Sequence, residues 1–429
     1  MNKVMNTTAQ AHHPDRHKDD PAITDATMRA EPAGLRESIR SLLRYCREHD
    51  WEGYDPYDAL NSRVFAATYL SRSRLCRLAL TQILKRLPVN VRSLLLVPTA
   101  QNPKAMGLFL AALLKLEGLG LSGKTGDVDG MIERLVHLRS LGTPFWCWGY
   151  SFPWQTRTDL VPRHAPNLVC TTFIANALLD AYEQRHEPRC RDMAESAAAY
   201  LAQELYWTAG DGAAGFSYPV PGMKSRIHNA NFLGAALLCR VASRTGDREL
   251  LDVALKVTRY AVSRQESDGS WYYGEGANQR WVDNFHTGYN LCALRDIGKY
   301  AGTDEFEPSL RCGYAFYRDS FFREDGAPKY YHDRDYPIDV HAVAQSIITL
   351  VELRDLDERS DERVRLVLAW ALEHLRDEAG YFYYQARPLY RNRISYMRWS
   401  QAWMLFALST VLERWYQDAG GTERLVSRE

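Results

Sequence analysis

The sequence predicts an all-α fold, an α/α toroid of about six helical hairpins with an inner and an outer ring of helices. Two observations support this prediction. An apolar helical pattern rich in small residues occurs six times along the 429 residues. Amphipathic segments with charged outer faces alternate with it, as helices with one buried stripe do. Six apolar helices wrapped by six one-sided helices form two concentric rings.

The six apolar segments recur at a nearly constant interval. Aligned on Ala112, Ala177, Ala236, Ala293, Thr349 and Ala407, they are separated by 65, 59, 57, 56 and 58 residues. Because each segment is apolar on nearly every face, we expect it to form an inner helix buried between neighbours. The six inner helices are expected to begin near Lys104, Val169, His228, Phe285, His341 and Trp399.

The amphipathic segments are expected to form the outer helices. They cover residues 61–84, 130–141, 190–205, 248–265, 306–322 and 362–377. Residues 37–49 predict one more helix before the first pair. Residues 1–34 are polar and predict a disordered tail, because they hold too few apolar groups to offset the entropy of ordering. Residues 35–429 are therefore expected to form a single toroid domain.

The connections between helices are of two kinds. Inner-to-outer links are short turns, whereas outer-to-inner links run to roughly 20 residues, well beyond the usual loop length. Nearly all the long links place aromatic residues after a glycine, as in "DGSWYYGEG" at 268–276. The toroid topology puts these loops on one face, over the N-termini of the inner helices. We expect the functional site there.

The overall composition excludes several classes of protein. Lys plus Arg number 53 and so do Asp plus Glu, a balance typical of neither a nucleic-acid binder nor a polybasic membrane-surface protein. The apolar runs are shorter than the ~20 residues of a membrane span, and the N-terminus lacks the apolar core of a secretory signal. The eight cysteines form no CxxC pair. We expect a cytoplasmic protein without a metal, a cofactor or a transmembrane segment.

Titratable side chains cluster where the long loops meet the inner helices. His228, His286 and His341 stand at equivalent heights of three repeats, just inside each helix. Their coincidence favours a shared site, since catalytic groups gather in clefts. An alternative holds for Asp283 and Asp339, which precede their helices closely enough to be N-caps. The catalytic candidates are His286, Asp283, Tyr273, His341, Asp339 and Glu275.

Aromatic and polar residues around the same rim suit the recognition of sugars. Flat rings stack on sugar faces, while amide, imidazole and guanidinium groups bind hydroxyls and carboxylates. The six inner-helix N-termini also favour an anion at this mouth. The substrate-binding candidates are His228, Asn229, Asn231, Arg398, Trp148, Tyr150, Trp154, Tyr289 and Tyr396.

Two family resemblances accompany this pattern. "QESDGSW" at 265–271 resembles the Gln-x3-Gly-x-Trp repeat core of squalene-cyclase and prenyltransferase toroids, and the six-hairpin layout extends over roughly 59–416. The acidic Asp-x-Asp-Asp motif and the zinc ligands of those families are missing, so the resemblance does not imply their chemistry.

A closer likeness is to the VpsJ-like family of bacterial exopolysaccharide-biosynthesis proteins. It rests on "GYDPYDALNS" (53–62), "FPWQTR" (152–157), "CTTFIANALLDAYE" (170–183) and "WVDNFHTGYNL" (281–291). The resemblance implies a role in making or trimming a surface polysaccharide.

The leading hypothesis is an enzyme of bacterial surface polysaccharide biosynthesis that processes an acidic, uronate-containing glycan. As a lyase or epimerase, it would use His286 or Tyr273 as the base, and Asn229 with Arg398 to neutralise the carboxylate. As a hydrolase, it would need a carboxyl pair, Asp283 with Asp339 or Glu275.

Two alternatives remain open. The first is a non-catalytic glycan-binding or scaffold subunit of a polysaccharide synthesis complex. The second is an enzyme like the terpenoid cyclases or prenyltransferases, which the positive field of the helix N-termini disfavours, because it would oppose a carbocation. The expected partners are an oligosaccharide or polysaccharide and the synthesis machinery.

Overall fold

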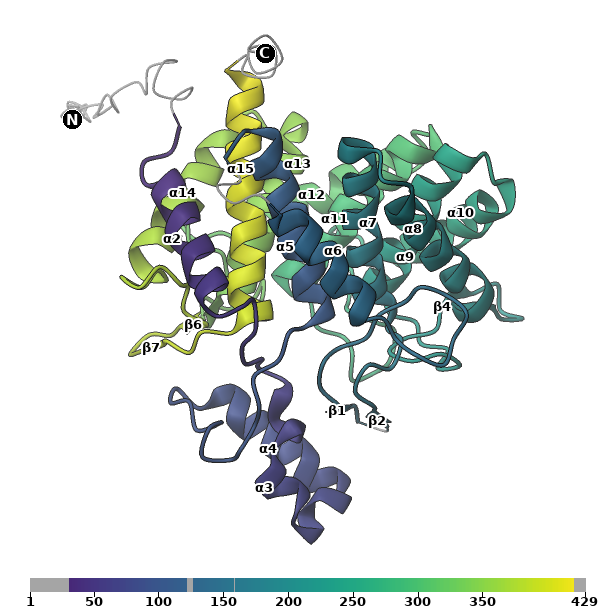
Figure 1. Cartoon of the computed structure of the whole chain (residues 1–429). Helices are drawn as coiled ribbons and strands as arrows, with labels where there is room; N and C mark the ends of the chain where they lie inside the picture. Colours follow the sequence, from purple (N-terminus) through teal and green to yellow (C-terminus); the bar gives the residue numbers. More distant parts are fainter. Residues whose placement is uncertain (1–30, 122–125, 158, 420–429) are drawn as a thin grey trace, which may run out of the picture.

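The computed structural model describes residues 31–121, 126–157 and 159–419. Most of the predicted tail, residues 1–30, lies outside these ranges. The prediction of an all-α toroid is confirmed: contacts between neighbouring helices close two rings around a central axis. Figure 1 shows these helices side by side.

The inner ring consists of the six apolar segments. Its helices are α5 (Pro103–Gly118), α7 (Leu168–Arg185), α9 (His228–Thr245), α11 (Asn284–Ala301), α13 (Val340–Glu352) and α15 (Trp403–Asp418), the last preceded by a π-helical turn, η5 (Met397–Ala402). Each begins within two residues of its predicted start when η5 is counted as the first turn of the last helix. Close approach between neighbours depends on small residues. A Cβ at Gly288 of α11 would stand 2.6 Å from Thr349 Oγ1 of α13, a distance that real Cβ atoms do not tolerate.

The outer ring is formed by α6 (Asp127–His137), α8 (Pro188–Tyr200), α10 (Arg248–Val262), α12 (Glu307–Ser320), α14 (Ser360–His374) and α2 (Leu35–Glu48). The place of α2 corrects the prediction, which treated this helix as an addition before the first pair. It packs on α15 and joins the two ends of the ring. Arg376, just after α14, donates to Ser41 Oγ of α2 at 3.0 Å, and Arg47 of α2 pairs with Asp127 of α6.

Residues 61–84, expected to form the first outer helix, lie outside the ring. They form part of an arm, residues 58–97, that contains η1 (Asp58–Asn61), α3 (Arg63–Ala66), η2 (Tyr69–Arg72) and α4 (Arg74–Arg86). Figure 1 shows it extending from the long-loop face, away from both rings. Serine N-caps at Ser62 and Ser73 start new helices inside this segment, and this interrupts the single amphipathic helix that the pattern predicts. The chain leaves and re-enters the body at a bridge between Gly53 and Ala100.

The β structure in the described part of the chain is confined to short antiparallel pairs within the long loops. The strands are β1 (Trp154–Gln155) with β2 (Leu160–Val161), β3 (Tyr206–Thr208) with β4 (Ala214–Phe216), and β5 (Ile338–Asp339), β6 (Gln385–Ala386) and β7 (Arg391–Asn392) in one three-stranded sheet. Within the described ranges, no helix combines the length and the apolar character needed to cross a bilayer.

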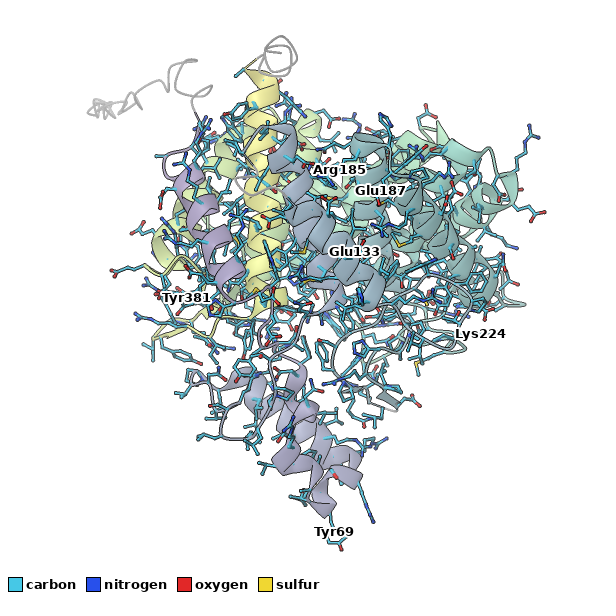
Figure 2. All side chains as sticks on the ribbon, in the orientation of Figure 1. Tyr69, Glu133, Arg185, Glu187, Lys224 and Tyr381 are labelled. Carbon is cyan, nitrogen blue, oxygen red and sulfur yellow. The ribbon has the colours of Figure 1, made fainter. Side chains whose placement is uncertain are left out.

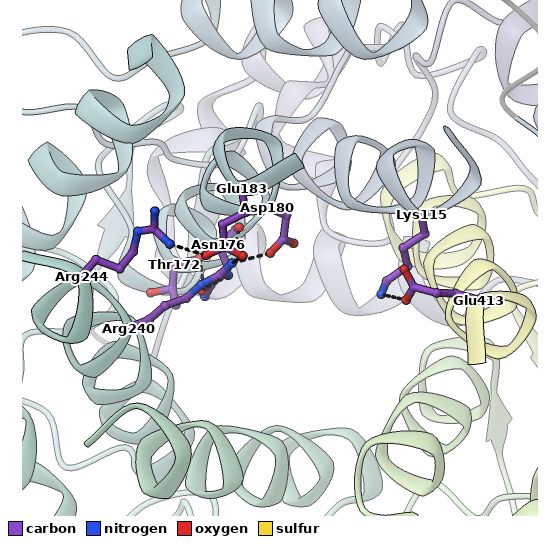
Figure 3. Close-up of polar contacts among 8 residues, drawn as sticks. All are labelled: Lys115, Thr172, Asn176, Asp180, Glu183, Arg240, Arg244 and Glu413. Carbon is purple, nitrogen blue, oxygen red and sulfur yellow. Dashed lines mark hydrogen bonds and ion pairs between the residues drawn. The ribbon is translucent and has the colours of Figure 1, made fainter. Parts of the chain in front are cut away.

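The opposite end of the central space is held by ion pairs between neighbouring inner helices (Figure 3). Arg240 of α9 reaches Asp180 and Glu183 of α7 at 2.6 and 3.0 Å, and Lys115 of α5 pairs with Glu413 of α15. Charged residues near the C-terminal halves of these helices therefore link two neighbouring pairs around the axis. The functional candidates lie at the other end.

Candidate active site

A cavity of about 400 Å³ opens where the N-termini of the inner helices meet the long loops. Every inner helix supplies at least one lining residue at the height that the repeat register predicts. These residues are Lys104, Val169, Asn229, His286, His341 and Trp399. The register therefore places one position of each repeat around a single cavity.

Asp283 and His286 form a carboxylate–imidazole pair at this rim. Asp283 caps α11 by accepting from His286 N at 3.0 Å, and its second oxygen accepts from His286 Nδ1 at 2.8 Å. Trp281 Nε1 also donates to that oxygen, at 3.0 Å. The Asp283 side chain is buried, whereas His286 is 21% exposed. Because a carboxylate fixes the proton on Nδ1, Nε2 of His286 is the nitrogen left for a ligand.

His341 forms a second polar pair deeper in the cavity. Its Nε2 lies 2.6 Å from the Tyr289 hydroxyl, and its ring is stacked between Phe285 and Trp403 at centroid distances of 4.5 and 4.4 Å. Burial, together with the positive charges of Lys104 and Arg398, lowers the pKa of His341 well below its usual range. Burial also raises the pKa of Tyr289. The pair is therefore neutral, with a protonated phenol available as a donor.

Lys104 brings an amine to the cavity wall without an anionic partner. Its side chain is buried, and Nζ lies 4.1 Å from the centroid of the Phe173 ring, 5.1 Å from that of Trp403 and 5.4 Å from that of Tyr289. Burial and the nearby Arg398 charge lower the pKa of Lys104 well below its usual range. Among the described residues, no carboxylate pairs with it. An anionic ligand group would supply that missing charge.

Arg398 differs from Lys104 because its charge is already balanced. Its Nε and Nη2 bind both oxygens of Asp55, at 2.6 and 2.9 Å, and both side chains are buried. Burial acts to lower the pKa of Arg398, yet the Asp55 carboxylate holds it above the usual value. The pair anchors the chain just before the arm to the start of α15. Arg398 therefore contributes shape and hydrogen bonding more than net charge.

Nine of the predicted site residues lie around the cavity. They are Asp283, His286, Tyr273, His341, Asn229, Arg398, Tyr150, Trp154 and Tyr289. Tyr273 stacks on Trp281 with ring centroids 4.5 Å apart, and burial raises its pKa well above the usual value. Tyr273 therefore suits the role of a hydrogen-bond donor better than that of a base.

Two predicted catalytic carboxylates point elsewhere, which corrects their expected positions. Asp339 is fully buried and accepts from His341 N, Trp399 Nε1 and Gln385 Nε2 at 2.9, 2.8 and 2.7 Å. It is the N-cap of α13, as the alternative reading expected. Glu275 accepts from Tyr260 OH and Arg226 Nη1, outside the cavity.

Four predicted binding residues are also outside the cavity. His228 is buried at the start of α9, where burial lowers its pKa to about 4. Asn231 accepts from Phe216 N at 3.0 Å and supports β4. Trp148 is buried with Nε1 donating to Leu135 O, and Tyr396 is buried with its ring against Tyr384. All four residues belong to the protein interior.

The structure adds lining residues that the sequence did not single out. They are Tyr57, Gln82, Lys85, Lys104, Phe152, Val169, Tyr218, Trp281, Phe285, Tyr330, Tyr331 and Trp399. Tyr218, Tyr330 and Tyr331 lie in the glycine-then-aromatic loops, so that signal identifies them in retrospect. Lys104, Val169, Phe285 and Trp399 stand at the register height, but their residue types did not suggest chemistry. Tyr57, Gln82 and Lys85 carry no such signal, because they come from the arm and the segment before it, which were not expected at the mouth.

The sequence matches no protein-family model and no curated protein sequence. The VpsJ-like resemblance therefore rests on the quoted motifs alone. Solved structures of similar fold do exist. One is a family 76 α-mannanase from Bacteroides thetaiotaomicron, with a TM-score of 0.58 at 13% identity over 74% of this chain and 86% of that one.

Two other similar structures are also of carbohydrate-active enzymes. Cellobiose 2-epimerase from Spirochaeta thermophila has a TM-score of 0.56 at 12% identity, covering 74% of this chain and 87% of its own. An unsaturated glucuronyl hydrolase specific for heparin has a TM-score of 0.56 at 12% identity, covering 90% of this chain and 98% of its own. At these identities the likeness shows the α/α-toroid fold.

Proposed function

We propose that this protein is an enzyme that binds an anionic saccharide in the mouth of the toroid and transfers a proton at a carbon atom of the sugar, as an epimerase or a lyase. One observation carries the proposal: the Asp283–His286 pair faces a cavity that also holds an unpaired, buried amine, Lys104. A base held by a carboxylate and a cation for the substrate's charge are the two groups that such a reaction requires.

The roles follow from the contacts. His286 Nε2 removes the proton from the carbon next to the sugar carboxylate, and Asp283 stabilises the imidazolium that forms. In a lyase, the C–O bond at the neighbouring carbon then breaks and the imidazolium protonates the leaving oxygen. In an epimerase, the carbon instead takes up a proton from solvent on its opposite face. Lys104 and Asn229 bind the carboxylate, on which negative charge accumulates as the carbon loses its proton. With His341 Nε2 as the donor to the Tyr289 hydroxyl, the phenol proton of Tyr289 is left to donate to one of the same oxygens. Arg398 is not needed to neutralise the substrate carboxylate, because its charge is already paired with that of Asp55.

Hydrolysis through two carboxyl groups is not supported by this cavity. Among the described residues that line it, Asp283 is the one carboxylate, since Asp339 and Glu275 are engaged elsewhere. Retaining and inverting glycosidases of the usual kind need a pair of carboxyl groups across the scissile bond. Terpenoid cyclisation is disfavoured as well, because Lys85 and Lys104 line the cavity and would oppose a carbocation.

The nature of the substrate follows from the walls of the cavity. Tyr150, Trp154, Trp281 and Trp399 offer ring faces on which sugars stack. The similar structures include a sugar epimerase and an enzyme that acts on unsaturated glucuronyl groups, which supports a saccharide substrate. The finer assignment, a uronate-containing polysaccharide of the bacterial surface and contact with its synthesis machinery, is supported by the VpsJ-like motifs.

Solvent exchange tests the reaction. The protein would be incubated in D₂O with oligosaccharides of different uronic acids, and the sugars analysed by NMR and mass spectrometry. Deuterium at the carbon next to the carboxylate, with inversion, identifies an epimerase. An unsaturated product identifies a lyase. Neither should form with His286→Gln. Binding of an oligosaccharide with no exchange and no product, across the panel, would overturn the proposal and favour a glycan-binding subunit.

A further inference from the structure

The zero net charge of the chain conceals a strongly uneven distribution. Residues 59–102 contain seven basic residues and no acidic one. The seven are Arg63, Arg72, Arg74, Arg77, Lys85, Arg86 and Arg92. Nearly all of this stretch belongs to the arm, which projects from the long-loop face (Figure 1). The arm is therefore a cationic body attached to an otherwise acidic remainder.

The arm also exposes most of the large apolar side chains found on the described surface. Eight of thirteen lie in it, namely Val64, Tyr69, Leu70, Leu75, Ile83, Val89, Leu94 and Leu96. Tyr69 is 84% exposed and points away from the ring at the tip of the arm (Figure 2). A concentration of this kind marks an interaction surface, whereas single exposed apolar residues do not.

The apolar side chains of α4 share a face with a cation. Leu75, Ala79, Ile83 and Arg86 are exposed and follow one another at helical spacing. The opposite face contacts the body through Arg77, which donates to Gln155 Oε1 at 2.7 Å, and it carries the buried residues Thr81 and Leu84. The arm thus has a bound face and a free face.

Four exposed arginines of the arm have no carboxylate partner among the described residues. Arg63, Arg72, Arg74 and Arg86 are exposed, and none of them pairs with a carboxylate in the described part of the chain. Arg92 differs, because it is buried against Asp58 at 2.6 Å. The free face therefore presents positive charges among apolar side chains.

A second projection on the same side repeats this combination. The turn between β6 and β7 holds Leu389, which is 96% exposed, and Tyr390, followed by the exposed Arg391 and Arg393. No acidic residue occurs between 379 and 412. Asn392 Nδ2 donates to Leu87 O at the end of α4, at 3.0 Å, so the hairpin and the arm are in direct contact. The two form one continuous surface.

We propose that the arm and the β6–β7 turn bind the headgroup region of an anionic lipid bilayer. Arginines attract the negative lipids, while Tyr69, Leu70, Leu75 and Leu389 enter the boundary between headgroups and acyl chains. This reverses the expectation from the overall charge, which excluded a membrane-surface protein. The protein would lie on the membrane without crossing it.

Charge and shape favour a lipid surface over other occupants. A second copy of the chain would bring two cationic arms together, and the like charges would repel each other. Exposed side chains at the tips of two convex projections suit a deformable surface better than a flat protein interface, which needs complementary shape. Tyrosine at the tip, with an apolar ring and a polar hydroxyl, suits the membrane boundary.

The proposal locates the cavity as well. Gln82 and Lys85 of α4 line it, so the helix that binds the bilayer also forms part of the mouth. The saccharide would then be taken from the membrane surface, as a lipid-attached or membrane-emerging chain. The inference of membrane binding does not depend on the proposed reaction.

Membrane binding is tested by co-sedimentation of the full-length protein with lipid vesicles. Vesicles of phosphatidylcholine alone would be compared with an equimolar mixture of phosphatidylcholine and phosphatidylglycerol. We expect binding to the anionic vesicles that weakens as salt is raised. In the variant Arg63→Gln/Arg72→Gln/Arg74→Gln/Arg86→Gln, the affinity should fall by at least about tenfold. Tyr69→Ser/Leu70→Ser/Leu75→Ser should weaken it too, with an unchanged melting temperature.

A matched control removes the same charge elsewhere. Arg191→Gln/Arg248→Gln/Arg311→Gln/Arg359→Gln changes four arginines of the outer ring and should bind vesicles like the wild type. Equal loss in this control and in the arm variant would overturn the proposal. So would a wild-type protein that ignores anionic vesicles at low salt. A dimer in light scattering that the Tyr69→Ser/Leu70→Ser/Leu75→Ser variant dissociates would, in that case, assign the surface to self-association.

Discussion

Asp283 makes two contacts with one carboxylate, a helix cap and a hydrogen bond to the proposed base. One oxygen caps α11, and the other holds the proton on His286 Nδ1. The sequence presented these roles as alternatives, and the structure shows that both contacts exist together. The consequence is that substitutions of Asp283 affect stability and activity through different atoms.

For His286→Gln we expect a loss of activity of roughly 10²–10⁴-fold, the usual contribution of a general base. The melting temperature should change by a few degrees at most, because the ring lies at the cavity and contributes little packing. Activity and thermal unfolding of the same preparation test this. Unfolding of the variant would show instead that His286 is a structural residue.

Two variants of Asp283 distinguish the contribution of the cap from that of the hydrogen bond to His286. Asp283→Ala should lower the free energy of unfolding by ~1 kcal/mol, because the cap is lost. Asp283→Asn keeps a capping oxygen and should be nearly as stable as the wild type, yet lose most of its turnover, since a neutral amide stabilises an imidazolium poorly. Full activity in Asp283→Asn would contradict the role of the pair.

Lys104→Met tests the recognition of an anion. The methionine keeps the length and shape of the side chain but removes the amine, so KM for a uronate substrate should rise about 10–100-fold, the cost of a lost charge-assisted hydrogen bond. The free energy of unfolding should stay the same or increase, because a buried amine without an anionic partner among the described residues is replaced by an apolar side chain. Binding of a neutral saccharide of equal length serves as the control. Equal weakening for both sugars would rule out charge recognition.

At the scale of helices, periodicity located the inner ring and misassigned one outer helix. Residues 61–84 and α2 are both amphipathic, and nothing in the pattern shows which of them packs on α15. That choice depends on contacts between the two ends of the chain, such as Arg36 Nη2 donating to Tyr416 OH at 2.6 Å. Periodicity indicates that one face of a helix is apolar, but it does not indicate which other element packs against that face.

A pair of leucine substitutions measures this difference between α2 and α4. Leu42→Ala in α2 should lower the free energy of unfolding by about 2–5 kcal/mol, because the side chain is fully buried against the ring. Leu75→Ala in α4 should change it by no more than about 0.5 kcal/mol, since Leu75 is 68% exposed. Chemical denaturation of both variants measures the two changes in the free energy of unfolding. Similar losses would mean that α4 is covered by protein.

The candidate site shows the same limit of sequence reasoning. The alignment of the repeats identified Asn229, His286 and His341 as cavity residues, because it predicts where each inner helix begins. It equally selected His228, whose side chain turns into the interior one residue before Asn229. A register gives the height of a residue along its helix, whereas a rotation of about 100° per residue decides whether the side chain faces the cavity.

At the scale of the whole molecule, buried histidines couple stability to pH. Burial lowers the pKa of His228 to about 4, whereas an unfolded histidine titrates near ~6.5. Between these values the unfolded chain binds a proton that the folded chain does not. Stability is therefore full above pH ~6.5, falls as the pH drops through this window, and levels off below about 4.

We expect His228 to account for about 3 kcal/mol of this loss. Burial raises the pKa of Asp58 to about 6, which acts in the opposite direction, so the wild-type curve alone does not isolate His228. The difference between the wild type and His228→Asn does, when denaturation is measured from pH 7.5 down to pH 4. A difference that stays constant over this range would show that folding does not shift the pKa of His228.

Ring closure by α2 and α15 has a consequence for the order of assembly. The helix synthesised first among the described ones must wait for the one synthesised last, across a contact of 380 residues. Until then the apolar stripe of α2 has no partner, and a nascent chain is open to misassociation. Because α2 and α15 are in contact, the fold does not itself determine which pair of helices forms last. A circular permutant opened at Gly302, with Glu31 and Ala419 joined by a linker, keeps every neighbouring pair of helices and changes only which pair forms last.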